Sequence, residues 1–248
     1  MDTPLLTPRP VPSVQAMKTA CSSCNLRELC LPVALQDNEL ERLDSLVAQR
    51  LAVPRGETLY RARDPFRSLY AVRSGFFKTL VTTADGREQV TGFLMAGELL
   101  GFDGIGTDRY SCDTVALEDS QVCVIPFEQL EALSRDFLPL QRQFHRIMSR
   151  EIVRDHGLIL LLGSMRAEER LAAFLLNLTQ RLASRGFSST ELVLRMTREE
   201  IGSYLGLKLE TVSRAFSKLQ DQGLLAVRHR QVRVVDPAGL RRLVDTLC

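Results

Sequence analysis

The first half of the chain carries short stretches in which apolar and polar positions alternate, a pattern typical of antiparallel strands. A short helix is predicted over 39–50, and strand-like stretches rich in β-branched and aromatic residues follow it: TLYRARD, SLYAVRSG, FFKTLVTT, EQVTGFLMAGELLG and SQVCVIPF. Asp85-Gly86 separates two of these stretches and favours a tight hairpin turn, because glycine accepts a positive φ. We therefore expect an antiparallel barrel or sandwich over roughly 52–128.

The spacing of apolar residues becomes helical near Pro139. Heptad-like steps then connect Met148, Ile152, Asp155, Ile159 and Leu162, with the aspartate between the two isoleucines. The helix would have about 24 residues and a length of ~36 Å. Such a helix either packs on its own domain or pairs with a second copy, and the narrow stripe favours pairing. We therefore expect a homodimer whose interface includes these five residues.

The last third of the chain has the pattern of a winged helix-turn-helix. An amphipathic helix over AEERLAAFLLNLTQRLASRGF ends at Gly186, and TELVLRM reads as a short strand. The next helix opens with Thr197 and Glu200 in capping-box spacing, and a second helix follows the turn at Gly206-Leu207 and ends at Gly223. LLAVRHRQVRVVD alternates like a two-stranded wing. Helix, tight turn, helix and basic hairpin are the parts of that motif.

The second helix of this motif has an apolar face and a polar face. The apolar positions predicted to bury the two helices against each other are Ile201, Leu205, Leu207, Val212 and Phe216. The outward positions are Glu210, Ser213, Arg214 and Ser217. Arginine can bind guanine with both arms and glutamate can accept from cytosine, so this face is able to read a major groove. An ordinary solvated face is the alternative, and the wing residues Arg228, His229, Arg230 and Arg233 favour DNA.

The charge is divided unevenly along the 248 residues, although the formal net charge is only +2. Residues 166–248 hold 14 basic and 9 acidic side chains, and the rest of the chain holds 18 basic and 21 acidic ones. The small net charge excludes a uniformly basic coat protein. The basic last third suggests a polyanionic partner, and a chance distribution of charge is the alternative. The expected parts of the chain are an N-terminal arm with the first three cysteines over 1–35, the antiparallel domain over 36–138, the long helix over 139–165 and the winged helix-turn-helix over 166–248.

The chain carries no apolar run of the ~18–20 residues that a membrane span needs. Residues 1–20 are rich in proline and have no periodicity, so we expect a mobile arm and no secretory signal. The expected location is the cytoplasm, without contact to a membrane.

The six cysteines lie at positions 21, 24, 30, 112, 123 and 248. Reducing conditions keep cytoplasmic thiols free, so the crowding of the first three indicates metal or redox chemistry. The spacing of Cys21, Cys24 and Cys30 leaves zinc, an iron–sulfur cluster and a redox thiol switch open. Cys123 and Cys112 compete as a fourth ligand, and Cys248 is expected to have no role.

In order and content these segments resemble the FNR branch of the catabolite activator protein superfamily, which comprises oxygen-responsive bacterial transcription regulators. The resemblance runs from Cys21 onward and rests on CSSCNLRELCLP, SLYAVRSG, QVTGFLMAGELLGFDGIG, QVCVIPFEQL, AEERLAAFLLNL, RGFS and IGSYLGLKLETVSR. It implies an α+β fold with an N-terminal antiparallel β-roll of the cyclic-nucleotide-binding jelly-roll type, a long dimerisation helix and a C-terminal winged helix-turn-helix.

The resemblance also implies functional residues. A [4Fe–4S] cluster would be held by Cys21, Cys24, Cys30 and Cys123, the last just before an Ile-Pro-Phe segment. RNA polymerase would meet the hairpin at Asp85-Gly86. The expected DNA contacts are Lys208, Glu210, Thr211, Ser213, Arg214, Ser217, Arg228 and Arg230. One departure is Lys208, because the family usually has Thr or Ser there; the lost N-cap costs about 0.5–2 kcal/mol, and a lysine can reach a DNA phosphate instead.

We therefore expect a homodimeric regulator, not an enzyme, that binds double-stranded DNA at a two-fold-symmetric site. Its cluster would be intact without oxygen, and it would then dimerise and activate anaerobic genes, with repression at some promoters. A cyclic-nucleotide receptor is the runner-up: Gly97-Glu98 matches its pocket, but Arg109-Tyr110-Ser111 lacks the adjacent Arg-Ser pair. An iron–sulfur enzyme is disfavoured because no CxxxCxxC or phosphate-binding glycine loop is present.

Overall fold

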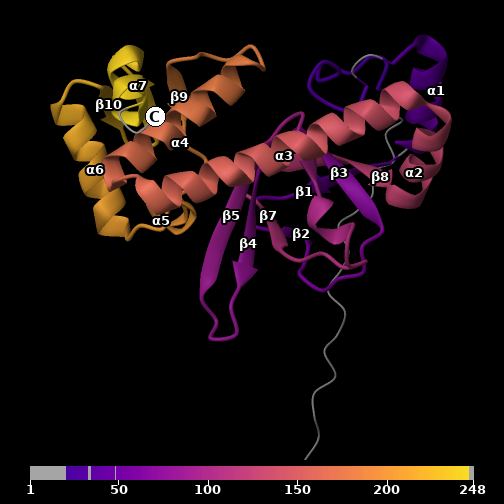
Figure 1. The fold of residues 1–248 in the computed structure, drawn as a ribbon, viewed down its shortest axis with the longest axis horizontal. Coiled ribbons are helices and arrows are strands. Elements are labelled where there is room, and N and C mark those ends of the chain that lie inside the picture. The colour runs from indigo at the N-terminus through magenta and orange to yellow at the C-terminus, as the bar shows by residue number, and fades with distance from the viewer. Residues whose placement is uncertain (1–20, 33–34, 48, 246–248) are drawn as a thin grey trace, which may run out of the picture.

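The structure is a computed structural model that describes residues 21–32, 35–47 and 49–245 (Figure 1). The arm predicted over 1–20 and Cys248 lie outside the described residues. Within them, no helix combines the length and the apolar character needed to cross a membrane.

Two four-stranded antiparallel sheets form a β-roll in the first half of the described chain. One has the order β1 (Gln49–Val53), β8 (Ser120–Pro126), β3 (Ser68–Ser74), β6 (Leu99–Leu100). The other has the order β2 (Thr58–Tyr60), β7 (Asp113–Ala116), β4 (Phe76–Thr82), β5 (Glu88–Met95). Alternating apolar residues such as Val72, Phe77 and Val122 fill the space between the sheets. The predicted antiparallel fold class is confirmed.

The hairpin predicted at Asp85-Gly86 joins β4 to β5 and projects from the roll (Figure 1). Gly86 has a φ of +83°, which explains why glycine stands there. The helix predicted over 39–50 was wrong at its end. Helix α1 covers Asp37–Leu46, and Gln49–Val53 is strand β1, because that segment pairs along its whole length with β8.

A 27-residue helix, α3 (Leu138–Ser164), follows the short η1 (Phe102–Gly104) and α2 (Phe127–Asp136) and crosses the molecule from the roll to the C-terminal domain (Figure 1). Pro139 lies in its first turn, where no intrahelical N–H bond is lost. Leu140 and Ile147 pack in the roll-side core near α1. At the other end, Leu161 enters the core of the C-terminal domain.

The C-terminal domain comprises α4 (Ala167–Ala183), β9 (Glu191–Val193), α5 (Arg198–Leu205), α6 (Leu209–Asp221), β10 (Leu225–Arg228), β11 (Gln231–Val234) and α7 (Pro237–Asp245). The capping box at Thr197 and Glu200 is present, and Gly206 ends α5 with a φ of +63°. A Cβ on Gly202 would lie 2.5 Å from the Leu207 carbonyl oxygen, so the helix-turn-helix needs glycine there. Strand β9 pairs with β11 and makes the wing three-stranded.

Arg170 fastens α3 to the winged helix. Its guanidinium donates to the carbonyl oxygens of Leu162 (2.8 Å) and Met165 (2.9 Å) at the end of α3 and to that of Leu205 (3.0 Å) at the end of α5. Cations at helix C-termini satisfy carbonyls that have no intrahelical partner. The long helix and the helix-turn-helix are therefore joined through one side chain.

The roll and the winged helix share one apolar cluster. Phe93 of β5 packs against Phe174 of α4 and Tyr204 of α5, with ring centroids 5.9 and 5.2 Å apart. Beside them the ammonium of Lys78 lies 2.8 Å from a carboxylate oxygen of Glu200. The winged helix is thus packed against the roll.

Candidate functional site

Residues 21–30, which we call the cysteine loop, bring three of the six cysteines together. Asp44 of α1 holds the start of the loop, because its carboxylate accepts the backbone N–H of Cys21 and, at 2.8 Å, the hydroxyl of Ser22. At its end, the Cys30 carbonyl accepts a bond of 3.3 Å from Nε2 of Gln143, a buried residue of α3. The loop therefore contacts both α1 and the long helix.

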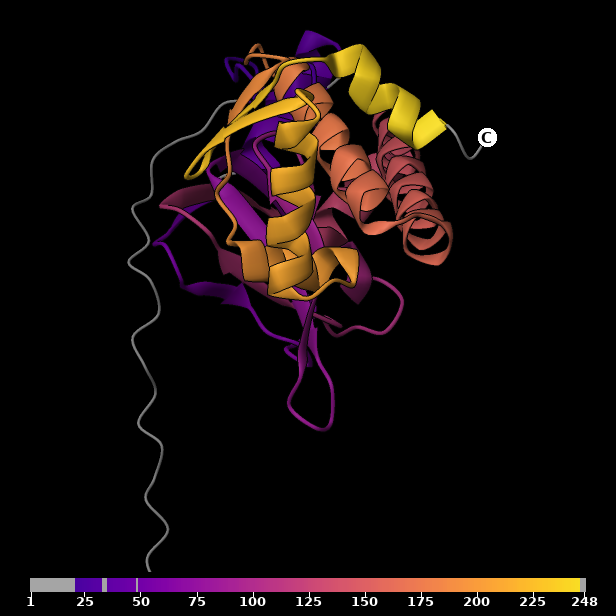
Figure 2. The same cartoon turned by 90° about the vertical axis from the view of Figure 1, so that its left-hand side faces the viewer.

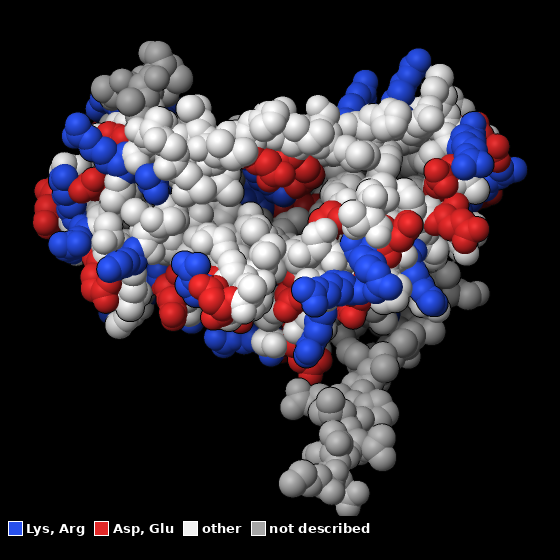
Figure 3. Space-filling model, turned by 60° about the horizontal axis from the view of Figure 1, so that its bottom comes forward, with Lys and Arg blue, Asp and Glu red and all other residues white. Residues whose placement is uncertain are grey.

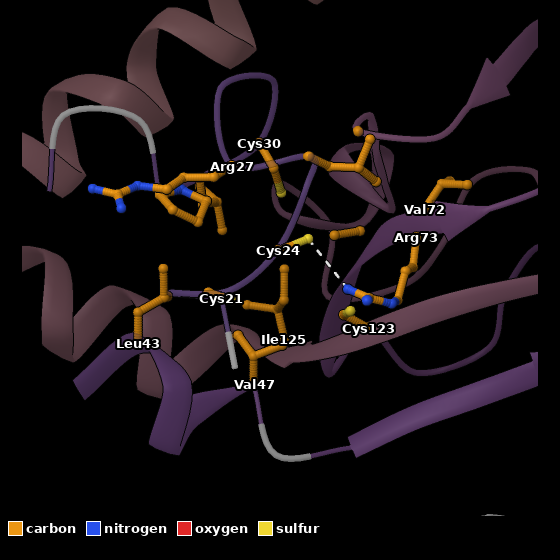
Figure 4. A pocket seen from close by; sticks show the side chains of 15 residues that line it. Cys21, Cys24, Arg27, Cys30, Leu43, Val47, Val72, Arg73, Cys123 and Ile125 are labelled. Carbon is orange, nitrogen blue, oxygen red and sulfur yellow. Dashed lines mark hydrogen bonds between the residues drawn. The ribbon is translucent and has the colours of Figure 1, made fainter. Parts of the chain in front are cut away.

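Cys123 comes to the same place from a distant part of the chain. It lies in the middle of β8, paired with Arg50 of β1 and Ala71 of β3. Its side chain and those of Cys21, Cys24 and Cys30 line one pocket with apolar neighbours (Figure 4). Nη1 of Arg73 lies 3.2 Å from Sγ of Cys24 and supplies positive charge at the rim. The structure thus brings together the four cysteines that the resemblance implies.

Cys112 lies elsewhere, in the interior of the roll beside Tyr60 and Tyr110. Its thiol is 3.4 Å from a carboxylate oxygen of Asp103. It does not line the pocket that holds the other described cysteines.

Three thiols of the pocket, those of Cys21, Cys30 and Cys123, have a raised pKa. Burial raises the pKa of Cys30 to about 12. Burial, followed by the nearby Cys30 and Asp44, also raises the pKa of Cys21 above its ordinary value. Burial raises the pKa of Cys123 although Arg50 and Arg73 oppose that shift. A cation that binds these sulfurs as thiolates must therefore displace protons.

The four thiols of the pocket match the number of thiolates that an iron–sulfur cluster takes. Within the described residues, no three or more His, Cys, Asp or Glu side chains form a group that could hold one metal ion. A [4Fe–4S] cluster takes four thiolates, so its ligands surround a volume instead of meeting at a point.

A polar face of α6 forms a candidate DNA interface. Glu210, Ser213 and Arg214 are exposed, whereas Val212 and Phe216 are buried against the rest of the domain. Figure 2 looks onto this domain, with α6 at the front. The exposed or half-buried residues of the predicted set are Lys208, Glu210, Thr211, Ser213, Arg214, Ser217, Arg228 and Arg230. Lys208 is the N-cap and makes no side-chain cap bond.

The positive charge near this interface comes from individual side chains and not from a large basic surface. On the face shown in Figure 3, basic and acidic side chains are interspersed, without one continuous basic field. Arg228 and Arg230 flank His229, whose φ of +55° makes the tight turn of the wing. The wing therefore presents cations beside α6.

The middle of α3 carries an exposed apolar stripe. Ile152 and Ile159 are 53% and 67% exposed, and Val153 and Leu160, which the sequence analysis missed, are 65% and 59% exposed. The second pair repeats the seven-residue step of the first, and this repeat is the signal that could have revealed it. Asp155 is exposed and lies about 60° around the helix from Ile152, on the flank of the stripe. Met148 and Leu162 are half-buried.

Gly97-Glu98 is the pair that matches the pocket of a cyclic-nucleotide receptor, but in this structure the Glu98 carboxylate binds arginines. Nη2 of Arg181 lies 2.6 Å from one oxygen of the Glu98 carboxylate, and Nη2 of Arg185 lies 2.8 Å from the other. A carboxylate already bound to two guanidinium groups is poorly placed to accept ribose hydroxyls.

Comparisons with known proteins agree with this architecture. A model of the Crp-like helix-turn-helix domain matches residues 169–243, and a model of the cyclic nucleotide-binding domain matches residues 50–137. The transcriptional regulatory protein btr of Bordetella pertussis is 51% identical over 224 residues, covering 90% of this chain and 93% of its own. The fumarate and nitrate reduction regulatory protein of Escherichia coli K12 is 45% identical over 223 residues, covering 90% and 89%. FixK2 from Bradyrhizobium japonicum has a similar structure, with a TM-score of 0.71 and 30% identity over 78% of this chain and 96% of its own.

Proposed function

The chain belongs to the CRP/FNR family of DNA-binding transcription regulators, and from this we propose that it senses oxygen or redox state through a [4Fe–4S] cluster. The observation that carries the proposal is the pocket lined by Cys21, Cys24, Cys30 and Cys123. The likeness to a fumarate and nitrate reduction regulator over nine-tenths of the chain supports it.

We assign the four cysteines as ligands of the cluster, which when bound supplies an oxygen-labile, redox-active centre. Three of them lie in the cysteine loop and Cys123 lies in the central strand β8, so a cluster bound by all four would join the loop to the roll. Arg73 and Arg50 lie beside these sulfurs and offset the negative charge of bound thiolates. Gln143 connects the backbone of Cys30 to α3, so a change in the loop reaches the long helix directly.

For DNA, we propose that α6 enters the major groove. Arg214 and Glu210 would contact base edges, because both are exposed on the outer face of α6. Lys208, Arg228 and Arg230 would contact phosphates, which position the protein without reading sequence.

We further propose that the active form is a homodimer paired along α3. The exposed stripe around Ile152, Val153, Ile159 and Leu160 supports a helix–helix seam, since water-exposed apolar residues in a row favour burial. Two symmetric copies would bind a two-fold-symmetric site with half-sites about one helical turn apart. The projecting hairpin at Asp85-Gly86 is the proposed RNA polymerase contact, and the cytoplasm is the proposed location.

The proposal is tested on protein purified without oxygen. We expect a brown protein with about four iron and four sulfide per chain, whose affinity for a duplex selected from random sequence falls when air is admitted. Sedimentation in the same samples should show dimer before air and monomer after it. A colourless protein that binds cyclic nucleotide and responds to it in DNA binding would overturn the proposal in favour of the runner-up.

A further inference from the structure

The turn formed by Gly97 and Glu98, which we call the Glu98 turn, lies between β5 and β6 and touches two helices outside the roll. The Glu98 side chain is only 13% exposed, and its carboxylate meets Arg181 of α4 and Arg185 in the turn that follows α4. Arg154 of α3 lies 3.8 Å from the same carboxylate. One buried anion thus joins the roll to the winged helix and to the long helix.

Arg181 and Arg185 also bind the backbone of the roll. Nη2 of Arg181 donates to the Phe93 carbonyl at 2.7 Å, and Nε of Arg185 donates to the Ala96 carbonyl. Burial alone would raise the pKa of Glu98, but Arg181, Arg154 and Arg185 together hold it below its ordinary value. The carboxylate is therefore ionised near neutral pH. Since a buried charge that loses its partners is strongly destabilising, the turn and α4 are held in one relative position.

On its other side the Glu98 turn meets the cysteine loop. Gly97 has a φ of +88°, and a Cβ there would lie 2.9 Å from Cβ of Leu29, so the loop packs directly on the turn. The backbone of Val72 bonds to both residues of the turn, at 2.8 Å to Gly97 N–H and 2.9 Å to the Glu98 carbonyl. The next residue is Arg73, whose guanidinium bonds to Cys24. The cysteine loop thus contacts the turn directly through Leu29 and indirectly through Arg73 and the neighbouring Val72.

We propose that the Glu98 turn transmits the state of the cysteine site to the winged helix and to α3. A shift of the cysteine loop moves Leu29 and Arg73, which are the neighbours that position the turn. Arg181 and Arg185 must then follow Glu98 or give up a buried ion pair. Arg154 has a second acceptor, since it also bonds to Glu151 one turn away, so it is able to exchange partners. Such exchange between two discrete pairings is how packed interfaces switch.

This inference rests on the proposed cluster function. The test compares wild type with Glu98→Gln, which keeps the shape of the side chain and removes its charge. The matched control is Glu118→Gln. Glu118 also joins the roll to the winged helix, through Arg195 at 3.0 Å, but it does not touch the turn. Each protein is loaded anaerobically with ferrous iron and sulfide, and the ratio of DNA dissociation constants without and with the cluster is measured on one selected duplex.

We expect Glu98→Gln to reduce this ratio about tenfold while its iron and sulfide content stays at the wild-type level. Glu118→Gln should keep the wild-type ratio. A Glu98→Gln protein with full iron content and an unchanged ratio would overturn the inference. If the wild type itself shows no cluster or no change in affinity, the proposed function fails instead, so the two failures are distinguishable.

Arg185→Gln tests the same pair from the side of α4 and serves if Glu98→Gln does not fold. The double variant should lose no more coupling than Glu98→Gln alone, because Arg185 acts through Glu98. Additive losses would mean that the two residues act independently, which also contradicts the inference. Faster hydrogen exchange in α4 on loss of the cluster, seen in wild type and absent from Glu98→Gln, is a readout that a merely structural ion pair would not give.

Discussion

The cysteine pocket and the DNA face of α6 are built in opposite ways. The DNA face comes from one short, continuous segment, and its polar side chains are exposed. The pocket joins the cysteine loop to a strand that follows almost a hundred residues later, and its thiols are at least partly buried. A surface that reads a partner needs accessible groups at fixed helical spacing. A pocket lined by residues from distant parts of the chain can change when those parts move relative to each other.

Removal of single thiols should have the largest effect. Cys21→Ser, Cys24→Ser, Cys30→Ser and Cys123→Ser should each abolish iron–sulfur content and activation of a reporter in cells, since each removes one thiolate ligand. Cys112→Ser is the control within the described residues and should be nearly silent, because that thiol lies in the roll interior. Full iron in Cys123→Ser with loss in Cys112→Ser would reverse the ligand assignment. Cys248→Ser should also be silent.

Between the two regions, Asp155 on α3 tests the proposed dimerisation along that helix. Two copies facing each other across a partly dry seam would repel with ~4 kcal/mol at 4 Å and an effective dielectric of 20. We expect Asp155→Ala to dimerise and to activate transcription in air. Sedimentation of the aerobic variant as a monomer, with reporter output equal to wild type, would show that Asp155 only faces solvent beside the stripe.

Two arginines separate base reading from phosphate contact on the DNA side. Arg214→Ala should weaken binding to the specific site by about 1–3 kcal/mol and relax base preference, as loss of a bidentate base contact does. Arg230→Ala should weaken specific and random DNA alike and flatten the salt dependence of binding. Titrations of both duplexes at several salt concentrations measure this. Equal losses on both duplexes for both variants would remove the distinction.

The smallest expected effect is the pH dependence of the Glu98 ion pairs. Because the pKa of folded Glu98 lies below its ordinary value of 4.5, its contribution to stability is fully present above that value and is lost as pH falls through the folded pKa. The difference in free energy of unfolding between wild type and Glu98→Gln should therefore be constant above about pH 5.5 and shrink towards pH 3, by about 1.4 kcal/mol per unit of pKa shift. A difference that grows as pH falls would contradict the sign. Urea unfolding at each pH provides the values.

The same contrast explains which features were predictable from the sequence. The faces of α6, the capping box of α5 and the Asp85-Gly86 hairpin depend on neighbours within a few residues, and local pattern identified all three. Strand β7 has only four residues and α1 ends earlier than its sequence suggests, because pairing with distant strands decides those segments.

The local sequence pattern could not show which residues come together at the pocket. Spacing alone left Cys112 and Cys123 equal, since each lies some ninety residues from the loop, and it is the pairing of β8 with β1 and β3 that places Cys123 there. The contacts of Glu98 with Arg181 and Arg185 join positions more than eighty residues apart. No periodicity in the sequence marks such a contact.

The unbroken length of α3 has a mechanical consequence. Its 27 residues span about 40 Å, and the hydrogen bonds of Arg170 connect its far end to the helix-turn-helix. A helix of this length that is attached at its far end can act as a lever arm that pivots at the end beside the cysteine loop. A tilt of about 5° at the pivot displaces the far end by about 3.5 Å, close to the ~3.4 Å rise of one base pair.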